Sequence, residues 1–309
     1  MDSNIQQNTI GILYPGEMGS TFGKLLADGG FQVVTTLQGR SDRTRRLCHN
    51  AGLRVLDCIR DVIQRSDILI SLVTPGAAVD VARNVAALVE SPARRLTYID
   101  ANSVSAATAV EISQILQVAS VDFVDACILS LASRLRERGT LYLSGFRAGE
   151  LSDLFGQLMR VKIAGDMPGQ ASAFKMIISG MPKGLVCLFV ETMVFAREMG
   201  LLNEALETYN EIYPGVMEVI KRMLPTYPQH AARRGEELRE VEQTMLLNGL
   251  TPCVLRAVRE VTVNLAGVGW TKGLEPQQWT VAELIEEAYR ETGHGSSGKD
   301  ARDTVRFSI

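Results

Sequence analysis

The sequence has little of what marks several common classes of protein. Its 309 residues include five cysteines, an odd number without any CxxC pair, and only three histidines. This argues against a disulfide framework or a zinc site, and it favours reduced thiols in the cytoplasm. The net charge of −3 gives no electrostatic basis for binding nucleic acid or an anionic membrane. The cysteines are Cys48, Cys58, Cys127, Cys187 and Cys253.

Long hydrophobic runs are scarce too. The stretch 176–196 is mostly apolar and about long enough to cross a bilayer, but it contains Lys183, Glu191 and Pro182. Charges at mid-bilayer depth are costly, so we predict a buried central helix instead. The first eight residues lack the basic and apolar regions of a signal peptide, and we expect no membrane association.

The first half of the chain alternates short apolar runs with stretches of helical periodicity. The runs are rich in Val, Ile and Leu, as buried strands are. Strands that alternate with helices imply a parallel sheet with helices on both faces. We therefore predict an α/β protein with an N-terminal Rossmann domain whose sheet is mostly parallel. The expected strands are 10–14, 31–37, 67–73, 96–100, 121–126 and 140–145, and the expected helices are 17–28, 42–50, 76–89 and 105–118.

The second half changes character near residues 161–169. Beyond that point the pattern is helical over 170–199, 202–209, 215–223, 229–247, 252–266 and 280–291. We predict a dinucleotide-binding domain at 1–166 and an all-helical domain for substrate binding and dimerisation at 167–291. Residues 292–309 are rich in Gly, Ser and charge, which predicts a flexible tail.

The first expected strand runs into the first expected helix through a glycine-containing turn. A dinucleotide fold needs glycines here, because the backbone must approach the pyrophosphate and the helix N-terminus must present its N–H groups. Gly16 and Gly19 fit the second and third glycines of GxGxxG, whereas Tyr14 occupies the first position. We expect Gly16, Glu17, Met18 and Gly19 to bind the cofactor. The alternative is an ordinary strand-to-helix turn.

The end of the second expected strand indicates which cofactor is used. NAD-preferring proteins usually have an acid here for the ribose 2′-hydroxyl, but this chain has Arg40 and Ser41, with no acid before Asp42. A guanidinium can pair with a 2′-phosphate, and Ser41 can donate a further hydrogen bond. We therefore predict NADP(H) as the cofactor. The alternative is a solvated basic turn.

Two later strands also end in segments suited to the cofactor. Ligands bind at the carboxyl ends of parallel strands in open α/β sheets. We expect the Val73-Thr74-Pro75 segment to border the nicotinamide, and Asn102 and Ser103 to offer polar groups near the reacting carbon. The alternative for each is loop capping, since Ser and Asn are favoured there in any case.

The helix that begins after Gly169 carries a lone lysine, Lys175, in an apolar setting. Hydride transfer to a carbonyl leaves an alkoxide that needs a proton, and the reverse reaction needs a base for the hydroxyl. Desolvation disfavours the ammonium, so the pKa of a lysine in an apolar pocket is lowered and the lysine can act in either direction. The alternative is a surface lysine with a buried stem. Lys183, further along the same helix, is expected to be structural.

These motifs, in this order, resemble the β-hydroxyacid dehydrogenase superfamily. Within it, the chain is most similar to a 6-phosphogluconate-dehydrogenase-like branch with a helical C-terminal domain of unknown function. The resemblance covers roughly residues 8–270. It is carried by the 16–19 turn, the 73–75 loop, and the segments 100–103, 124–126 and 169–175.

The resemblance implies roles for several residues. Lys175 matches the family's general acid/base, while Ser179 stands where the family has an asparagine. The family's carboxylate-binding stretch is here Asp125-Ala-Cys-Ile-Leu-Ser130, without its glycines. We therefore expect Lys175, Ser103 and Ser179 at the catalytic centre, with Ser103, Ser130 and Lys175 toward the substrate. The family also implies an intertwined homodimer through the helical domain.

Three hypotheses follow for the function. The first is an NADPH-dependent dehydrogenase or reductase acting on a small molecule with a CH–OH or C=O group, and the altered loop suggests a larger or less acidic substrate, in specialised metabolism. The second is imine reduction on the same scaffold, although imine reductases commonly carry Asp or Tyr at the position of Lys175. The third is a dinucleotide-binding protein without turnover.

Overall fold

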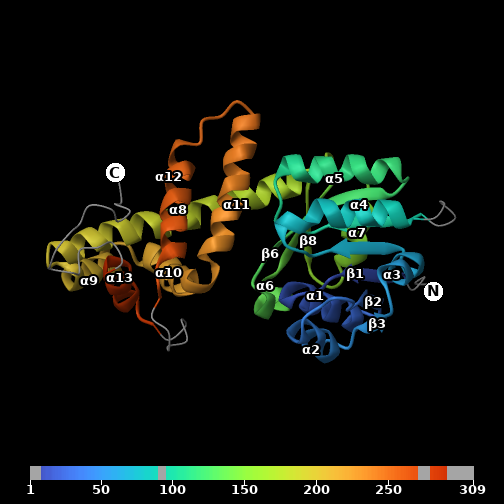
Figure 1. Ribbon diagram of the computed structural model, residues 1–309, viewed down its shortest axis with the longest axis horizontal. Coiled ribbons are helices and arrows are strands. Elements are labelled where there is room, and N and C mark those ends of the chain that lie inside the picture. The colour runs from blue at the N-terminus through green and yellow to red at the C-terminus, as the bar shows by residue number, and fades with distance from the viewer. Residues whose placement is uncertain (1–7, 90–94, 271–278, 291–309) are drawn as a thin grey trace. The chain divides into compact units, whose positions relative to one another are not determined.

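The computed structural model describes residues 8–89, 95–270 and 279–290 (Figure 1). The chain divides into two compact units, Met1–Met176 and Ile177–Ile309. The predicted tail at 292–309 and the last residue of the predicted helix 280–291 lie outside the described residues.

The first unit is built on an eight-stranded sheet with the order β3-β2-β1-β4-β5-β6-β7-β8. Neighbouring strands are parallel except for the antiparallel pair β6 and β7. This confirms the predicted α/β fold with a mostly parallel sheet. The strands are β1 (Thr9–Leu13), β2 (Gln32–Thr36), β3 (Arg54–Leu56), β4 (Ile68–Ser71), β5 (Thr97–Asp100), β6 (Asp122–Leu129), β7 (Thr140–Ser144) and β8 (Arg160–Gly165).

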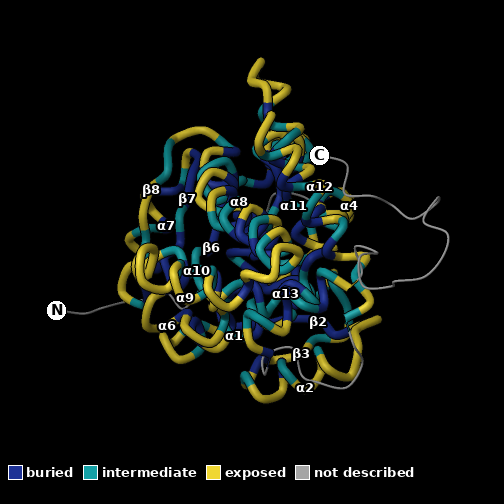
Figure 2. Tube along the Cα trace, turned by 90° about the vertical axis from the view of Figure 1, so that its left-hand side faces the viewer, coloured by how far each residue is buried: buried dark blue, intermediate teal, exposed yellow. Residues whose placement is uncertain are grey.

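Helices cover both faces of this sheet and bury an apolar core on each side. On one face the core joins α1 (Glu17–Asp28), α2 (Asp42–Asn50), α6 (Leu135–Arg138) and α7 (Ala148–Phe155) to the strands. On the other face it joins α3 (Ile59–Arg65), α4 (Ala78–Leu88) and α5 (Ala106–Val118). Figure 2 shows β6 buried over most of its length and α2 largely exposed, as expected for a central strand and a peripheral helix.

Five of the strands and α-helices of this unit were not predicted: β3, α3, α6, α7 and β8. Strand β3 has only three residues and little burial, so it gives no periodic signal. Strand β8 is the last in the sheet, and half of its residues are exposed, Lys162 among them. Edge strands commonly carry such charges, and the alternation of polar and apolar residues in β8 covers only residues 160–163, which is too short to be a clear strand signal.

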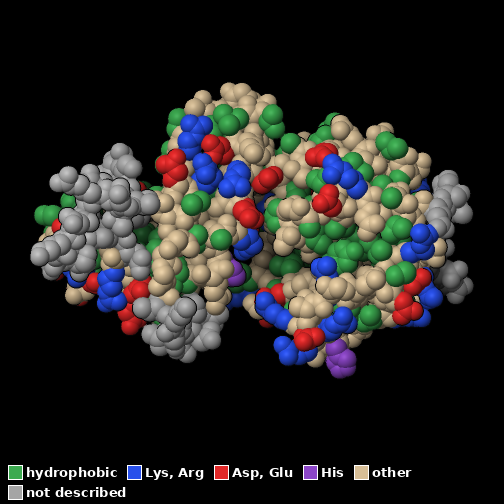
Figure 3. Space-filling view, viewed as in Figure 1, with side chains coloured by type: hydrophobic (Ala, Val, Ile, Leu, Met, Phe, Trp, Pro, Cys, Tyr) green, Lys and Arg blue, Asp and Glu red, His purple; other side chains and the backbone are tan. Residues whose placement is uncertain are grey.

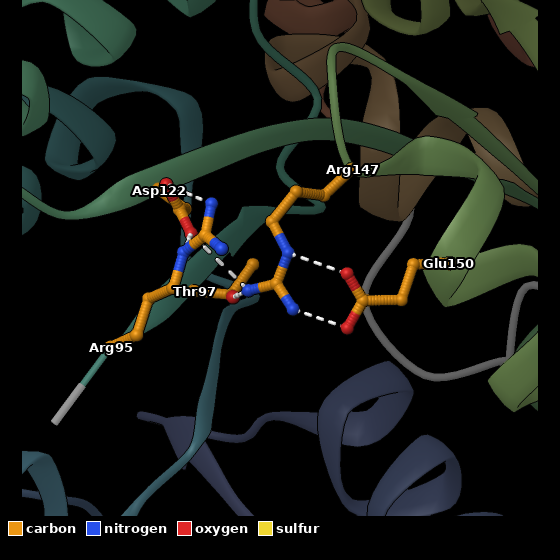
Figure 4. A network of polar contacts seen from close by, with 5 residues as sticks. All are labelled: Arg95, Thr97, Asp122, Arg147 and Glu150. Atoms are coloured by element: carbon orange, nitrogen blue, oxygen red, sulfur yellow. Dashed lines mark hydrogen bonds and ion pairs between the residues drawn. The ribbon is translucent and has the colours of Figure 1, made fainter.

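A polar network joins the first residues of β5 and β6 to the start of α7 (Figure 4). It lies at the amino-terminal ends of these two parallel strands. Arg147 bonds the buried hydroxyl of Thr97 and reaches Asp122 Oδ2 at 3.3 Å. Its guanidinium also pairs with Glu150, with Nε to Oε2 at 2.8 Å. Arg95 contacts Asp122 from the other side. These contacts hold together the amino-terminal ends of β5 and β6. They lie at the other end of the strands from the loops that follow the carboxyl ends.

The second unit is helical, as predicted. The residues that form its core come mainly from α8, α10, α11 and α13, with Leu202 of α9 and Leu265 of α12. Figure 3 shows acidic and basic side chains mixed over α11 and α12, where Glu242 pairs with Arg256 and Arg259. The helices are α8 (Gln170–Glu198), α9 (Leu202–Ile212), α10 (Pro214–Met223), α11 (Tyr227–Leu247), α12 (Cys253–Gly267) and α13 (Val281–Tyr289).

Helix α8 contains the apolar stretch 176–196. Within the described residues it is the one helix long and apolar enough to cross a membrane, with a mean hydropathy of 1.5 over the best window. That window is 39 % buried, and Val186, Phe189, Val190 and Met193 belong to the core of the second unit. The helix thus contributes to the core of the second unit, but it is less buried than predicted, since Ile177, Met181 and Phe195 are exposed. The helix continues through Pro182.

Candidate functional site

The turn between β1 and α1 has the geometry of a phosphate-binding turn. Gly16 is the N-cap of α1 and makes no side-chain capping bond, so the first N–H groups of the helix have no partner from a capping side chain. A Cβ at Gly16 would meet nothing within 4 Å, so the space beside the backbone is open. A Cβ at Gly19 would lie 3.0 Å from the Pro15 side chain. Gly16 thus leaves room for a ligand, and Gly19 allows close packing of the helix on the turn.

Tyr14 adopts a left-handed backbone conformation in this turn, with φ of 51°. Its ring lies under the guanidinium of Arg40, whose Cζ is 4.5 Å from the ring centroid. Arg40 follows a tight turn in which its N–H bonds Leu37 O at 3.1 Å and Gly39 has φ of 71°. Ser41 is the N-cap of α2 and accepts a hydrogen bond from Thr44 N at 3.3 Å. The structure therefore brings Arg40 and Ser41 to the same corner as the glycine turn.

Asn102 joins the loops that follow β4 and β5. Its Oδ1 accepts from Val73 N at 2.6 Å, and its Nδ2 donates to Ser71 Oγ at 3.1 Å and to Asp100 Oδ2 at 2.9 Å. The side chain is buried, so in this structure it fixes the Val73 loop to the end of β5. Beside it, Thr74 and Gly76 are exposed, and Pro75 and Ser103 are half-buried.

The start of α8 is fastened to the sheet through the carboxylate of Asp125. Asp125 Oδ2 accepts from Ser172 N and from Ser144 Oγ, both at 3.0 Å, and Oδ1 accepts from Ser172 Oγ at 2.6 Å. Ala171 N donates to Ser144 Oγ at 3.0 Å. Gly169 turns the chain into the helix with φ of 92°, and a Cβ there would lie 2.8 Å from Ala106 O. These bonds fix the turn of α8 that leads to Lys175.

Lys175 is half-buried on this helix, near β5 and β6. Its charge acts on two neighbours that are themselves fully buried, Asp100 and Cys127. Burial raises the pKa of Cys127 to about 12, and the charge of Lys175 opposes that rise. The lysine is thus held beside the carboxyl end of β5, where the sheet presents its loops.

Asp100 and Asp125 are register partners on β5 and β6. The pKa of Asp100 is raised to about 7, because burial and, to a smaller extent, the charge of Asp125 outweigh the lowering by hydrogen bonds from Asn102 and by the charge of Lys175. Burial also raises the pKa of Asp125, and its bonds from Ser172, Ser144 and Ala171 lower it. A pair of buried carboxylates beside one lysine can store a proton close to that lysine.

Two further predicted site residues, Ser130 and Ser179, and the neighbouring Lys183 lie in different parts of the structure. Ser130 Oγ donates to Leu131 O at 2.8 Å at the end of β6. Ser179 belongs to the second unit, where Lys183 Nζ lies 3.3 Å from its hydroxyl. Lys183 is buried and pairs with Glu237 Oε2 of α11 at 2.9 Å. This ion pair supports the expected structural role of Lys183.

The sequence analysis assigned no role to Asp100 and Asp125, although both lie in segments that carry the family resemblance. A usable signal was present, because an acid within an apolar strand is unusual unless it is paired or hydrogen-bonded. Among the described residues no group of three or more His, Cys, Asp or Glu side chains could hold a metal ion.

The chain is similar to known proteins in its domains and over most of its length. Residues 9–145 match the NAD binding domain of 6-phosphogluconate dehydrogenase, and residues 196–265 match a domain of unknown function, DUF1932. An uncharacterized 28.5 kDa protein of Methanothermus fervidus is 29 % identical over 253 residues, which is 82 % of this chain and 96 % of that protein.

Solved structures agree with these matches. A conserved protein of unknown function, described as structurally similar to 3-hydroxyacid dehydrogenases, is 29 % identical, with a TM-score of 0.66 over 84 % of this chain and 97 % of that one. The 3-hydroxyisobutyrate dehydrogenase of Mycobacterium tuberculosis is 16 % identical, with a TM-score of 0.70 over 91 % and 98 %. An imine reductase of Myxococcus stipitatus, solved with NADP+, is 17 % identical, with a TM-score of 0.52 over 90 % and 99 %. A variant of it was solved with NAD+.

Proposed function

Because this chain belongs to the β-hydroxyacid dehydrogenase superfamily, in a branch with a helical C-terminal domain, we propose that it is an NADP(H)-dependent oxidoreductase acting on a carbonyl or hydroxyl substrate. The matched NAD-binding domain makes an oxidoreductase the supported class. The observation that carries the proposal is the placement of Lys175 beside the carboxyl ends of the strands, on a helix fixed by Asp125.

The residues present fit a dinucleotide. Gly16 leaves open space at the N-terminus of α1, and a helix N-terminus favours the negative pyrophosphate. Arg40 and Ser41 stand at the end of β2 and would hold a 2′-phosphate, which is why NADP(H) is proposed over NAD(H). When bound, the nicotinamide supplies or accepts the hydride. The loops with Val73, Thr74 and Asn102 would form its border.

Lys175 would supply or remove the proton that accompanies hydride transfer. A positive charge near the developing alkoxide also stabilises it. Asp100 would assist indirectly, because its charge lies close enough to be felt by the lysine. Ser103, in the loop after β5, would add a hydrogen bond at this centre, and Ser179, one turn after Lys175 on α8, is the other residue proposed to act with the lysine.

The substrate is proposed to be larger or less acidic than a small hydroxy acid, consistent with a role in specialised metabolism. Glycines let backbone N–H groups approach a carboxylate closely. The segment after Asp125 has Cys127, Ile128 and Leu129 instead, and all belong to strand β6. Ser130 is the first polar side chain beyond them and would face the substrate.

Imine reduction is the second candidate. The imine reductase structures share the fold of this chain, and Ser179 and the missing glycines depart from the hydroxyacid pattern. Imine reduction needs a hydride at the carbon and a proton at the imine nitrogen, and Lys175 would donate that proton.

A homodimer through the helical unit is also proposed. Large apolar side chains on α8 are exposed, with 71 % of Ile177, 73 % of Met181 and 66 % of Phe195 accessible. Such clusters mark interaction surfaces. Sedimentation of wild type and Met181→Asp would test it, with a dimer expected only for wild type and a monomeric wild type contradicting it.

The deciding experiment is titration of the purified protein with NADPH and NADH, followed by nicotinamide fluorescence, and then a screen of carbonyl and imine substrates. Tight NADPH binding with much weaker NADH binding is expected. Lys175→Ala should retain NADPH binding and lose turnover by about 100-fold or more. Lys24→Ala, which removes an exposed lysine on α1, is the matched control and should change neither.

Other outcomes separate the alternatives. Failure of both dinucleotides to bind would overturn the proposal. Turnover by Lys175→Ala at the wild-type rate would remove the lysine from the mechanism. NADPH binding without any turnover in the screen would favour a dinucleotide-binding protein that lacks catalysis.

A further inference from the structure

Tyr14 occupies the position of the first glycine in a GxGxxG turn, and it does so with a positive φ of 51°. Residues with a Cβ adopt this conformation uncommonly, whereas glycine adopts it freely. A tyrosine in such a place is therefore retained at a conformational cost, which contacts of its side chain must offset.

The side chain makes two kinds of contact. One side packs against the apolar core between the sheet and the helices α3 to α5. The ring also faces Arg40, whose Cζ lies 4.5 Å from the ring centroid. This distance is within the range of a cation–π interaction, in which the negative face of the ring attracts the guanidinium. Tyr14 thus links the glycine turn after β1 to the end of β2.

Arg40 has a fixed backbone and a guanidinium group that can bind an anion. Its backbone is fixed by the bond from its N–H to Leu37 O and by the helix cap at Ser41. Its neighbour Arg43 pairs with Glu17 at 3.5 Å, whereas no carboxylate pairs with Arg40 within the described part of the chain. Contact with the ring engages the flat face of a guanidinium and leaves its N–H edge for ligands.

We propose that Tyr14 determines cofactor specificity, because its ring holds the Arg40 guanidinium ready at the turn and so favours a dinucleotide with a 2′-phosphate. The inference rests on the proposed dinucleotide binding. Holding a long side chain in place before binding reduces the entropy lost on binding. The tyrosine that replaces the first glycine therefore favours NADP(H) over NAD(H), and it does so by positioning Arg40.

The test compares binding of four ligands to the full-length protein by calorimetry: NADPH, NADH, and the adenosine fragments with and without the 2′-phosphate. Tyr14→Leu removes the ring, and we expect it to weaken NADPH and the 2′-phosphorylated fragment by about 3- to 10-fold. NADH and the plain fragment should change less than about 2-fold. Tyr14→Phe keeps the ring and should bind all four as wild type does.

Arg45→Gln is the matched control for charge, since it removes another exposed arginine nearby in the sequence, on α2. It should leave the ratio of NADPH to NADH affinity nearly unchanged, whereas Arg40→Gln should abolish the preference. In Arg40→Gln the further change Tyr14→Leu should then have no effect on the ratio. Such coupling is expected only if the tyrosine works through the arginine.

Failure of the inference can be told apart from failure of the proposed function. If wild type binds NADPH selectively but Tyr14→Leu, folded by circular dichroism, keeps the same ratio, Tyr14 has no part in selectivity. If Tyr14→Phe loses the preference, the hydroxyl and not the ring is responsible, and the inference is overturned. If wild type binds neither dinucleotide, the proposed function itself falls.

Discussion

The carboxylate of Asp125 on β6 accepts hydrogen bonds from both the backbone N–H and the hydroxyl of Ser172, two residues into α8. An acid at a helix N-terminus is favourable, because the free N–H groups and the helix dipole both carry positive charge there. Lys175 follows three residues later on the same helix. The start of the helix that carries the lysine is thus held to the sheet by the buried carboxylate of Asp125, together with Ser144, which accepts from Ala171 N.

Replacement of Asp125 by asparagine should disturb this attachment. An amide nitrogen would face a donor where a carboxylate oxygen now accepts, so we expect a loss of about 1–3 kcal/mol in the free energy of unfolding. Urea denaturation measures it. Ser172→Ala removes only the hydroxyl and should cost about 1 kcal/mol. Asp153→Asn, an exposed acid on α7, is the control and should have almost no effect. Equal stability of wild type and Asp125→Asn would contradict this account of the helix start.

Asp100 should give the protein a pH-dependent stability. Its pKa is about 7 in the folded protein and about 4 in an unfolded chain, so the folded state binds the proton more tightly. The stabilisation from protonated Asp100 is therefore fully present below pH of about 4 and is lost as the pH rises through about 7. The free energy of unfolding should fall by up to about 4 kcal/mol over this range. Urea denaturation at a series of pH values should show this fall.

Asp100→Asn should flatten the decline between pH of about 4 and 7, because the amide does not titrate. A variant that declines as steeply as wild type would show that another group is responsible. Asp80→Asn, which changes an exposed acid of α4, should leave the wild-type profile intact. The comparison isolates the buried carboxyl from the general charge of the surface.

Gly16→Ser should move stability and cofactor binding in opposite directions. Serine is a good N-cap and its Cβ meets no neighbour, so the free energy of unfolding should stay equal or rise by about 0.5–1 kcal/mol. The same hydroxyl would occupy the N–H groups and the space proposed for the pyrophosphate. We expect dinucleotide affinity to fall by about 10-fold or more. Gly149→Ser, on α7, also adds a side chain in open space and should not change binding. Unchanged affinity in Gly16→Ser would remove this turn from the site.

Arg147→Met should destabilise the first unit without touching dinucleotide binding. The change leaves the buried hydroxyl of Thr97 without this donor and separates α7 from β6 (Figure 4), so we expect a cost of about 1–3 kcal/mol. Arg83→Met removes an exposed arginine that also pairs with two acids, Asp80 and Glu111. Exposed pairs contribute little, so its cost should stay below about 1 kcal/mol. Similar costs for the two variants would refute the special role of Arg147.

The glycine turn, the alternation of strands and helices, and the lysine helix are all visible in the sequence. Each is a local pattern, in which neighbours along the chain supply the periodicity or the turn residues that define it. Gly16, Gly19 and Lys175 therefore stand out from the order of residues alone. The short strand β3 and the edge strand β8 do not, because β3 has only three residues and the alternation in β8 extends over only the four residues 160–163.

The sequence alone determined the kind of fold and pointed to the segments for which we propose dinucleotide binding and proton transfer, because short-range patterns encode both. The tertiary structure decided which distant residues act together. Asp100 meets Asp125 only through the register of β5 on β6, and Arg40 meets Tyr14 only because β1 and β2 pair. Strand register follows from packing across the whole sheet, so no local stretch of sequence reveals these contacts.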